Sequence, residues 1–142
     1  MAGTGFFWSR LSPYFLSILR IVLGFLYMEH GSEKLLGFLP GNGQLNLISP
    51  HAMLTLVPGL AGVLELGGGF LILIGLFTRP VAFILSGEMA FAYFLAHFPH
   101  NHVFPLLNGG GMAVAFCFTF LYLSAAGGGP WSVGAKLAPR WS

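Results

Sequence analysis

The chain has 142 residues, of which 56% are hydrophobic and only 7% are charged, and its formal net charge is +2. An ordinary soluble domain carries about 25% charged residues, so this composition excludes one and predicts a single-domain integral membrane protein. The small and unclustered positive charge argues against nucleic acid as a partner. The one cysteine, Cys117, excludes an intrachain disulfide and any CxxC redox or metal site, and we expect it to pack as an inert side chain.

Four apolar stretches have about the length that a helix needs to cross a bilayer. They predict an all-α fold, an integral membrane four-helix bundle in which residues 1–142 form one four-span domain. The predicted spans are residues 11–36, 59–77, 80–98 and 108–123, and residues 127–142 are predicted to form an interfacial or mobile tail. Residues 38–57 are predicted to form a loop, because proline, glycine and asparagine cluster at 40–43.

The first span carries a stripe of polar or small residues at helical spacing. Its members are Arg20, Gly24, Tyr27, Gly31 and Lys34.

The second span, residues 59–77, is apolar except for Glu65 near its middle. A carboxylate at that depth costs at least about 2.5 kcal/mol and usually faces a partner or a wet cavity. Gly62, Gly68 and Gly69 lie three or four residues from Glu65, on the same helical face. This face is small, so we expect a neighbouring helix to come close to the acid.

Basic residues predict the orientation of the spans. Of the six lysines and arginines, four fall on one side of a four-span hairpin arrangement: Arg10, Arg79, Lys136 and Arg140. The opposite side has Lys34 alone, beside Glu29 and Glu33. The positive-inside rule therefore predicts a multi-pass protein with both termini in the cytoplasm.

Three charged residues on three different spans are predicted to lie at similar depth, namely Arg20, Glu65 and Glu88. Charged groups in hydrocarbon pair or become neutral, so we expect Arg20 to contact Glu65, Glu88 or both. The favoured interpretation of this intramembrane cluster is a salt bridge that fixes helix registry. The alternative is a buried proton or ligand site, because two acids and one arginine leave one acid free to hold a proton.

A second polar cluster is predicted at the outer interface. It contains Glu29, His30, Glu33, Lys34, His97 and Asn108, with His51, His100 and His102 nearby. Imidazoles and carboxylates can bind a transition metal or polarise a quinone carbonyl. The spacing matches no metal signature such as HExxH, so no metal site is predicted and the residues are interpreted as interfacial.

Several segments together resemble the DoxX family of small bacterial and archaeal membrane proteins. They are LRIVLGFLYMEHGSEKL, LELGGGFLILIGLFTRPVA, GEMAFAYFLAHFPH, HVFPLLNGGG and GGGPWSV, and the resemblance covers residues 19–131. Six charged or histidine residues match the pattern of the family: Arg20, Lys34, Glu65, Arg79, Glu88 and His97. Gly111 and Gly134 stand where many relatives have an acid, which puts in doubt any activity that needs the fourth-span acid.

The resemblance implies a four-helix membrane bundle associated with redox enzymes, since relatives form membrane subunits of thiosulfate:quinone oxidoreductase or partner antioxidant enzymes. The leading hypothesis is a redox-associated subunit at or near the quinone pool of a bacterial or archaeal cytoplasmic (inner) membrane, where a quinone is the one cofactor considered and none is bound covalently. The alternative is a non-catalytic accessory subunit of a larger respiratory or photosynthetic complex. A small transporter is disfavoured, because no inverted repeat is visible. In either role we expect the lipid bilayer and other membrane subunits as partners, and no catalysis by the chain alone.

Overall fold

The structure, a computed structural model, describes residues 3–36, 56–99 and 104–137 of the chain. All regular secondary structure in these three ranges is helical. Most of the predicted loop over residues 38–57 lies outside the described residues, as do His51, His100, His102 and Arg140.

The helices follow the predicted spans closely. Helix α1 covers Gly3–Leu36, and the second span consists of α3 (Leu56–Val63), a π-helical segment η1 (Leu64–Gly68) and α4 (Gly69–Ile74). The third span consists of α5 (Thr78–Ala92) and a second π-helical segment, η2 (Tyr93–His97). Helix α6 covers Gly111–Ala126, and the short α7 covers Val133–Leu137. Helix α1 therefore begins earlier than predicted and α6 begins later, because Gly109, at φ 72°, belongs to the turn before α6.

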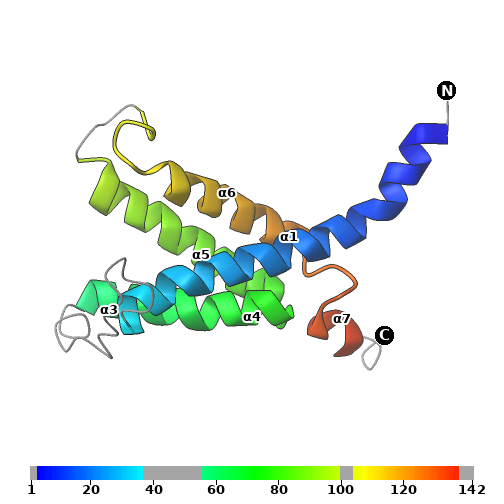
Figure 1. Cartoon of the computed structure of the whole chain (residues 1–142), viewed down its shortest axis with the longest axis horizontal. Coiled ribbons are helices and arrows are strands. Elements are labelled where there is room, and N and C mark those ends of the chain that lie inside the picture. The colour runs from blue at the N-terminus through cyan, green and yellow to red at the C-terminus, as the bar shows by residue number, and fades with distance from the viewer. Residues whose placement is uncertain (1–2, 37–55, 100–103, 138–142) are drawn as a thin grey trace.

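Helix α1, the run from α3 to α4, helix α5 and helix α6 follow one another in alternating directions (Figure 1). Helix α1 packs mainly on α3, η1 and α4, while α5 packs mainly on α6. The N-terminal part of α1 projects past the other helices, and this end of α1 lies at the same end of the molecule as α7 (Figure 1). The C-terminal end of α1, which carries Lys34, lies at the opposite end of the molecule, together with α3 and the turn before α6 (Figure 1).

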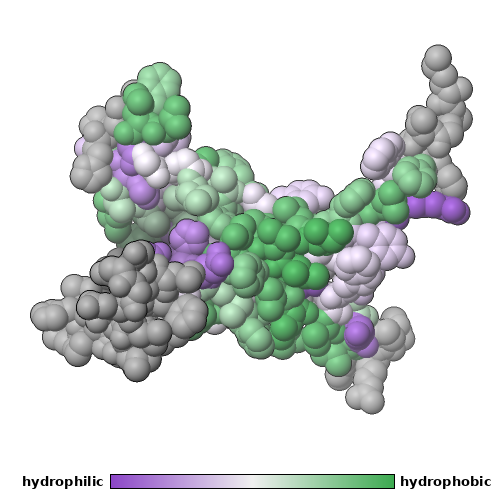
Figure 2. All heavy atoms as spheres, viewed as in Figure 1, coloured by the Kyte–Doolittle hydropathy of each residue, from purple (hydrophilic) through white to green (hydrophobic). Residues whose placement is uncertain are grey.

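Among the described residues, two helical stretches are long and apolar enough to cross a membrane, Phe7–Leu35 and Thr78–His97. Two more apolar helical stretches, Gly59–Ile74 and Gly111–Ala126, have fewer than the 18 residues required of a span here. Much of the visible surface is apolar (Figure 2), and large side chains such as Phe83 and Phe118 are each 65% exposed. These features suit a helical membrane protein, whereas four full spans remain a prediction.

The stripe predicted on the first span is the face that packs against the rest of the protein. Tyr27 is 1% exposed, and its ring centroid lies 5.3 Å from that of Phe116 and 4.8 Å from that of Phe120. A Cβ placed on Gly24 would lie 2.5 Å from the amide nitrogen of Leu73, so the two backbones touch. The small residues of the stripe thus allow close helix contact, as small residues do between membrane helices.

Candidate functional site

Arg20 does not join the acids with which it was predicted to pair. Its guanidinium is completely buried and donates hydrogen bonds to four backbone carbonyl oxygens. The acceptors are Ile72 at 2.6 Å, Leu73, Gly128 at 2.8 Å and Trp131 at 2.9 Å. The predicted contact with Glu65 or Glu88 is therefore wrong. The last carbonyls of a helix have no intrahelical donor, so the end of α4 offers Arg20 acceptors that the depth argument overlooked.

Glu65 instead pairs with Lys34, at the other end of the α1 stripe. The Nζ atom of Lys34 lies 2.6 Å from Oε1 of Glu65. Glu65 is 2% exposed, while the side chain of Lys34 is 42% exposed. The pair therefore joins a buried carboxylate to a lysine side chain that is partly exposed. The other carboxylate oxygen of Glu65, Oε2, is buried and accepts no hydrogen bond from any described residue.

The close approach of α1 to η1 makes this ion pair geometrically feasible. A Cβ on Gly31 would lie 2.3 Å from the amide nitrogen of Leu66, the residue after Glu65. A Cβ on Gly62 would lie 3.3 Å from Cβ of Lys34. The prediction that small residues let a neighbouring helix reach Glu65 is thus confirmed. Such residues occur both on the span of Glu65, at Gly62, and on α1, at Gly31. Glu65 also lies in a π-helical segment, a local departure from the α-helix that is frequent at functional sites.

Glu88 receives its hydrogen bond from the core tyrosine. The hydroxyl group of Tyr27 donates to Oε2 of Glu88 at 3.0 Å. The second oxygen, Oε1, is buried and has no hydrogen-bond partner among the described residues. Both acids therefore have the same arrangement, in which one oxygen is held by α1 and the other is left over.

The two acids line one chamber of about 630 Å³ between the second and third spans. Among the described residues that line it, Lys34, Glu65 and Glu88 are charged and the others are apolar. Four lining residues are also more than half exposed: Leu60, Ile84, Phe91 and Leu95. The chamber thus opens sideways between α3 and α5, through an apolar rim. In a membrane, such an opening would face the acyl chains.

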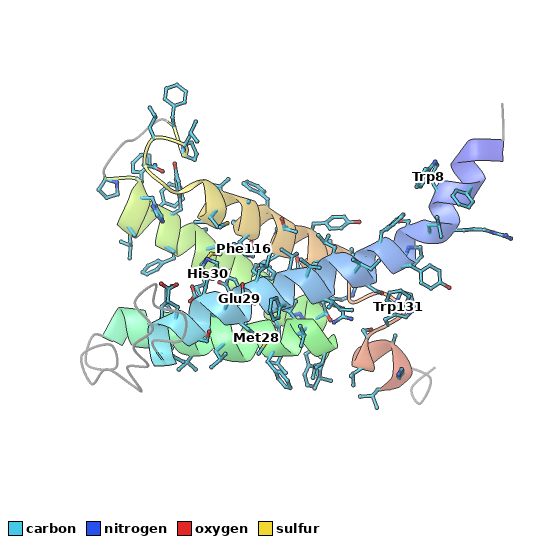
Figure 3. All side chains as sticks on the ribbon, viewed as in Figure 1. Trp8, Met28, Glu29, His30, Phe116 and Trp131 are labelled. Atoms are coloured by element: carbon cyan, nitrogen blue, oxygen red, sulfur yellow. The ribbon has the colours of Figure 1, made fainter. Side chains whose placement is uncertain are left out.

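The outer-face cluster is only partly brought together. His97 lies with its Nδ1 atom 3.1 Å from the carbonyl oxygen of Asn108, and the Asn108 side-chain amide donates to the Tyr93 hydroxyl group at 3.3 Å. His30 instead lies on α1 beside Phe116, with ring centroids 5.7 Å apart (Figure 3). Its Nδ1 atom is 2.9 Å from the carbonyl oxygen of Leu26.

Glu29 and Glu33 stay at the surface end of α1, half-buried and exposed respectively, and neither takes part in the Lys34 ion pair. Within the described ranges, no three His, Cys, Asp or Glu side chains gather as metal ligands would. Cys117 is half-buried, and its carbonyl oxygen accepts a hydrogen bond from Ser86 at 2.8 Å.

Tyr27 is the candidate site residue that sequence reasoning missed. The stripe placed it beside Arg20 and Lys34, which was the available signal, but nothing in the sequence tied its hydroxyl group to Glu88. The chamber itself had no sequence signal, because the apolar residues that line it cannot be told from lipid-facing residues in the sequence.

Comparison with known proteins supports the resemblance described above. Residues 15–98 match the family model of DoxX. The chain is 42% identical, over 126 residues, to an uncharacterized protein of Haemophilus influenzae (strain ATCC 51907 / DSM 11121 / KW20 / Rd). That match covers 84% of this chain and 88% of the relative. No solved structure matches significantly.

Proposed function

We propose that this chain, which belongs to the DoxX family, binds a quinone ring in the chamber between α3 and α5 and serves a redox enzyme at the quinone pool. The observation that supports this proposal is the pair of carboxylates, each with one oxygen that has no hydrogen-bond partner among the described residues, in a chamber whose described lining is apolar apart from them and Lys34. Small-molecule sites typically combine an apolar lining with a few polar groups, in volumes of about 300–1,000 Å³. A quinone offers the matching chemistry, an apolar ring and tail with two carbonyl oxygens that accept hydrogen bonds.

The chamber holds donors suited to those carbonyl oxygens. The ammonium group of Lys34 has three N–H donors, of which Glu65 takes one. A carboxyl group donates a hydrogen bond only when it is protonated, so Glu65 or Glu88 would donate in its neutral form. The apolar rim formed by Leu60, Ile84 and Phe91 would let a lipid-soluble ring enter from the bilayer.

The role of the acids would be to supply protons. Reduction of a quinone to a quinol consumes two electrons and two protons. Glu65 and Glu88 would pass protons to the ring, and the half-exposed Lys34 would connect Glu65 to the aqueous side. The electrons would come from a flavin or metal centre of a partner subunit, because no described side chain of this chain carries electrons. The isolated chain should therefore not reduce quinone with a small reductant.

Matched tryptophan variants test the binding site. Ile84 lines the chamber, whereas its neighbour Phe83 is 65% exposed and is not part of the lining. Ile84→Trp should weaken binding of a short-tailed ubiquinone analogue by about tenfold, the equivalent of a steric penalty of about 1.4 kcal/mol. Phe83→Trp, with the same added side chain one position away, should bind like wild type. Equal affinity of the two variants, measured by equilibrium dialysis in detergent, would refute the proposed site.

The proposed topology has four spans in the cytoplasmic (inner) membrane of a bacterium or archaeon, with both termini in the cytoplasm. The N-terminal end of α1 and the tail helix α7 lie at one end of the molecule (Figure 1), which also carries Arg79. Single cysteines at Leu106, 89% exposed in the turn before α6, and at Lys136 in α7 test this after Cys117→Ser. Labelling of position 106 from outside and of position 136 only after permeabilisation is expected. The reverse labelling pattern would show that the termini lie outside the cytoplasm.

A second candidate function, an accessory subunit of a larger respiratory or photosynthetic complex, has its own observation. The projecting part of α1 carries exposed aromatic side chains, with Phe7 58%, Trp8 61% and Phe15 51% exposed. Phe7 packs edge-on against Trp8 at 5.5 Å, and Trp8 stacks with Phe15 at 6.4 Å. Aromatic surface of this kind is common at interfaces. Fixed-stoichiometry copurification with large subunits, abolished by truncation before Leu11, would favour this role.

A further inference from the structure

A second cavity, of about 650 Å³, lies at the opposite end of the molecule from Lys34, where α4 ends, α5 begins and α6 ends. Tight turns build its walls. Gly75, Gly127 and Gly129 have φ of 72°, 88° and 71°, and Phe77 is left-handed at φ 51°. Helix α7 closes one side through Ala135 and Leu137. In Figure 1 these turns gather beside α7, near the N-terminal half of α1.

The exposed Arg79 presents two more guanidinium nitrogens, Nε and Nη2, to this cavity. Its Nη1 atom donates to the carbonyl oxygens of Ser124, at 3.5 Å, and Ala125, at the end of α6. No hydrogen bond from Nε or Nη2 is found within the described parts of the chain. Both atoms face Gly127, 3.4 Å from where a Cβ would sit on that glycine. The edge formed by Nε and Nη2 is one that binds a phosphate group through two parallel hydrogen bonds.

Thr78, which also lines the cavity, is an independent sign of a ligand site. Its side chain is 6% exposed, and its hydroxyl group has no hydrogen-bond partner among the described residues. The hydroxyl oxygen faces the glycine turn, 2.8 Å from where a Cβ would sit on Gly128. Thr78 is also the first residue of α5, a helix of 15 residues whose N-terminus has no side-chain cap. At this helix start only Thr78 and Arg79 can offer free N–H groups, because Pro80 has none and the N–H of Val81 donates to the carbonyl oxygen of Phe77. Such first N–H groups lack intrahelical acceptors and attract anions.

The charge distribution favours an anion at this end. The chain has only four acidic residues, Glu29, Glu33, Glu65 and Glu88. None of them lines this cavity, and two line the other chamber. The helix C-terminal carbonyls that would repel an anion are occupied by Arg20 at the end of α4 and by Arg79 at the end of α6. The result is a cavity with spare cationic and N–H donors and no carboxylate.

We infer that this cavity binds a phosphate group, held by the free edge of Arg79, the Thr78 hydroxyl group and the N-terminus of α5. In a membrane family the phosphodiester of an anionic phospholipid headgroup offers this chemistry, and inorganic phosphate offers it as well. The inference uses no residue of the quinone chamber.

The test measures thermal stabilisation of the full chain, in detergent, by added ligand. The probes are short-chain phosphatidylglycerol, a diacylglycerol of the same chain length, which lacks phosphate, and inorganic phosphate. Arg79→Gln should weaken the apparent affinity about tenfold or more, because it removes a charge-assisted bidentate contact. Thr78→Val, which keeps the shape and the fold, should weaken it by about threefold to tenfold through loss of one hydrogen bond. Arg10→Gln, which removes the same charge elsewhere, should bind like wild type.

Each outcome decides the inference. Stabilisation by phosphatidylglycerol but not by diacylglycerol, reduced in both cavity variants, supports the site with a lipid headgroup as its source. The same dependence with inorganic phosphate alone supports the site with free phosphate as its source. No stabilisation by either phosphate compound overturns the inference. An equal loss of affinity in Arg10→Gln also overturns it, and so does wild-type affinity in both Thr78→Val and Arg79→Gln.

Discussion

The buried charges of this chain fall into two regions that differ in how fully their hydrogen bonds are used. At the glycine-rich end, all three guanidinium nitrogens of Arg20 donate to backbone carbonyl oxygens from two separate turns. In the chamber, Glu65 and Glu88 each use one carboxylate oxygen, and no residue in the described parts of the chain hydrogen-bonds the other. A satisfied buried charge fixes structure, whereas an unsatisfied buried oxygen needs an explanation such as a ligand, a proton or water.

The largest expected effect is on the satisfied region. Arg20→Met should lower the free energy of unfolding by about 4 kcal/mol or more, because four carbonyl oxygens lose a charged donor. Of these, the Ile72 oxygen would still accept from the N–H group of Gly75. Arg20→Lys should recover little of this stability, since an ammonium group cannot reach all the acceptors that the planar guanidinium group reaches. Thermal unfolding in detergent measures both. A mild loss in Arg20→Met would mean that Arg20 does not hold the turns together.

A double variant separates this account from the salt-bridge hypothesis. If Arg20 is independent of Glu65, the effects of Arg20→Met and Glu65→Gln should add to within about 0.5 kcal/mol. Recovery of stability in the double variant would show that the two residues are coupled after all.

The next effect concerns the close contact that brings Lys34 to Glu65. Gly31→Ala should lower stability by about 1–3 kcal/mol, because the added methyl group overlaps the backbone at Leu66 and forces α1 away. Gly67→Ala is the matched control, since a Cβ there meets nothing within 4 Å, and it should stay within about 0.5 kcal/mol of wild type. Similar losses in the two variants would argue against the observed contact between α1 and η1.

The smallest effect on stability is expected in the chamber, where function should suffer most. Glu88→Gln keeps an acceptor for the Tyr27 hydroxyl group, so stability should change by less than about 1 kcal/mol. Tyr27→Phe should cost about 1 kcal/mol, the net value of one hydrogen bond. Quinone-linked turnover with the partner enzyme should fall strongly in Glu88→Gln but not in Glu29→Gln, whose acid lies outside the chamber lining. Normal turnover in Glu88→Gln would remove that acid from proton transfer.

Sequence reasoning reached the helices and the packed face of α1, because length, hydropathy and helical spacing are local properties. It also identified Glu65 as a buried acid with small residues around it. It failed for Arg20, because depth along a helix says nothing about free carbonyl oxygens at the end of another helix. It failed for the chamber and for the link between Tyr27 and Glu88, because these depend on how α1 and α5 are rotated against each other. The two π-helical segments were equally invisible, since η1 and η2 have ordinary apolar sequences apart from Glu65 and His97.

The most direct test of the central claim is whether the chamber acids respond to a ligand. Infrared difference spectra of the purified chain, recorded with and without a short-tailed ubiquinone analogue, report the carboxyl groups themselves. We expect a shifted carboxyl band on binding, which is lost or reduced in Glu65→Gln and Glu88→Gln and retained in Glu29→Gln. A spectrum with no carboxyl change under saturating quinone, or a change that persists in both chamber variants, would contradict the account.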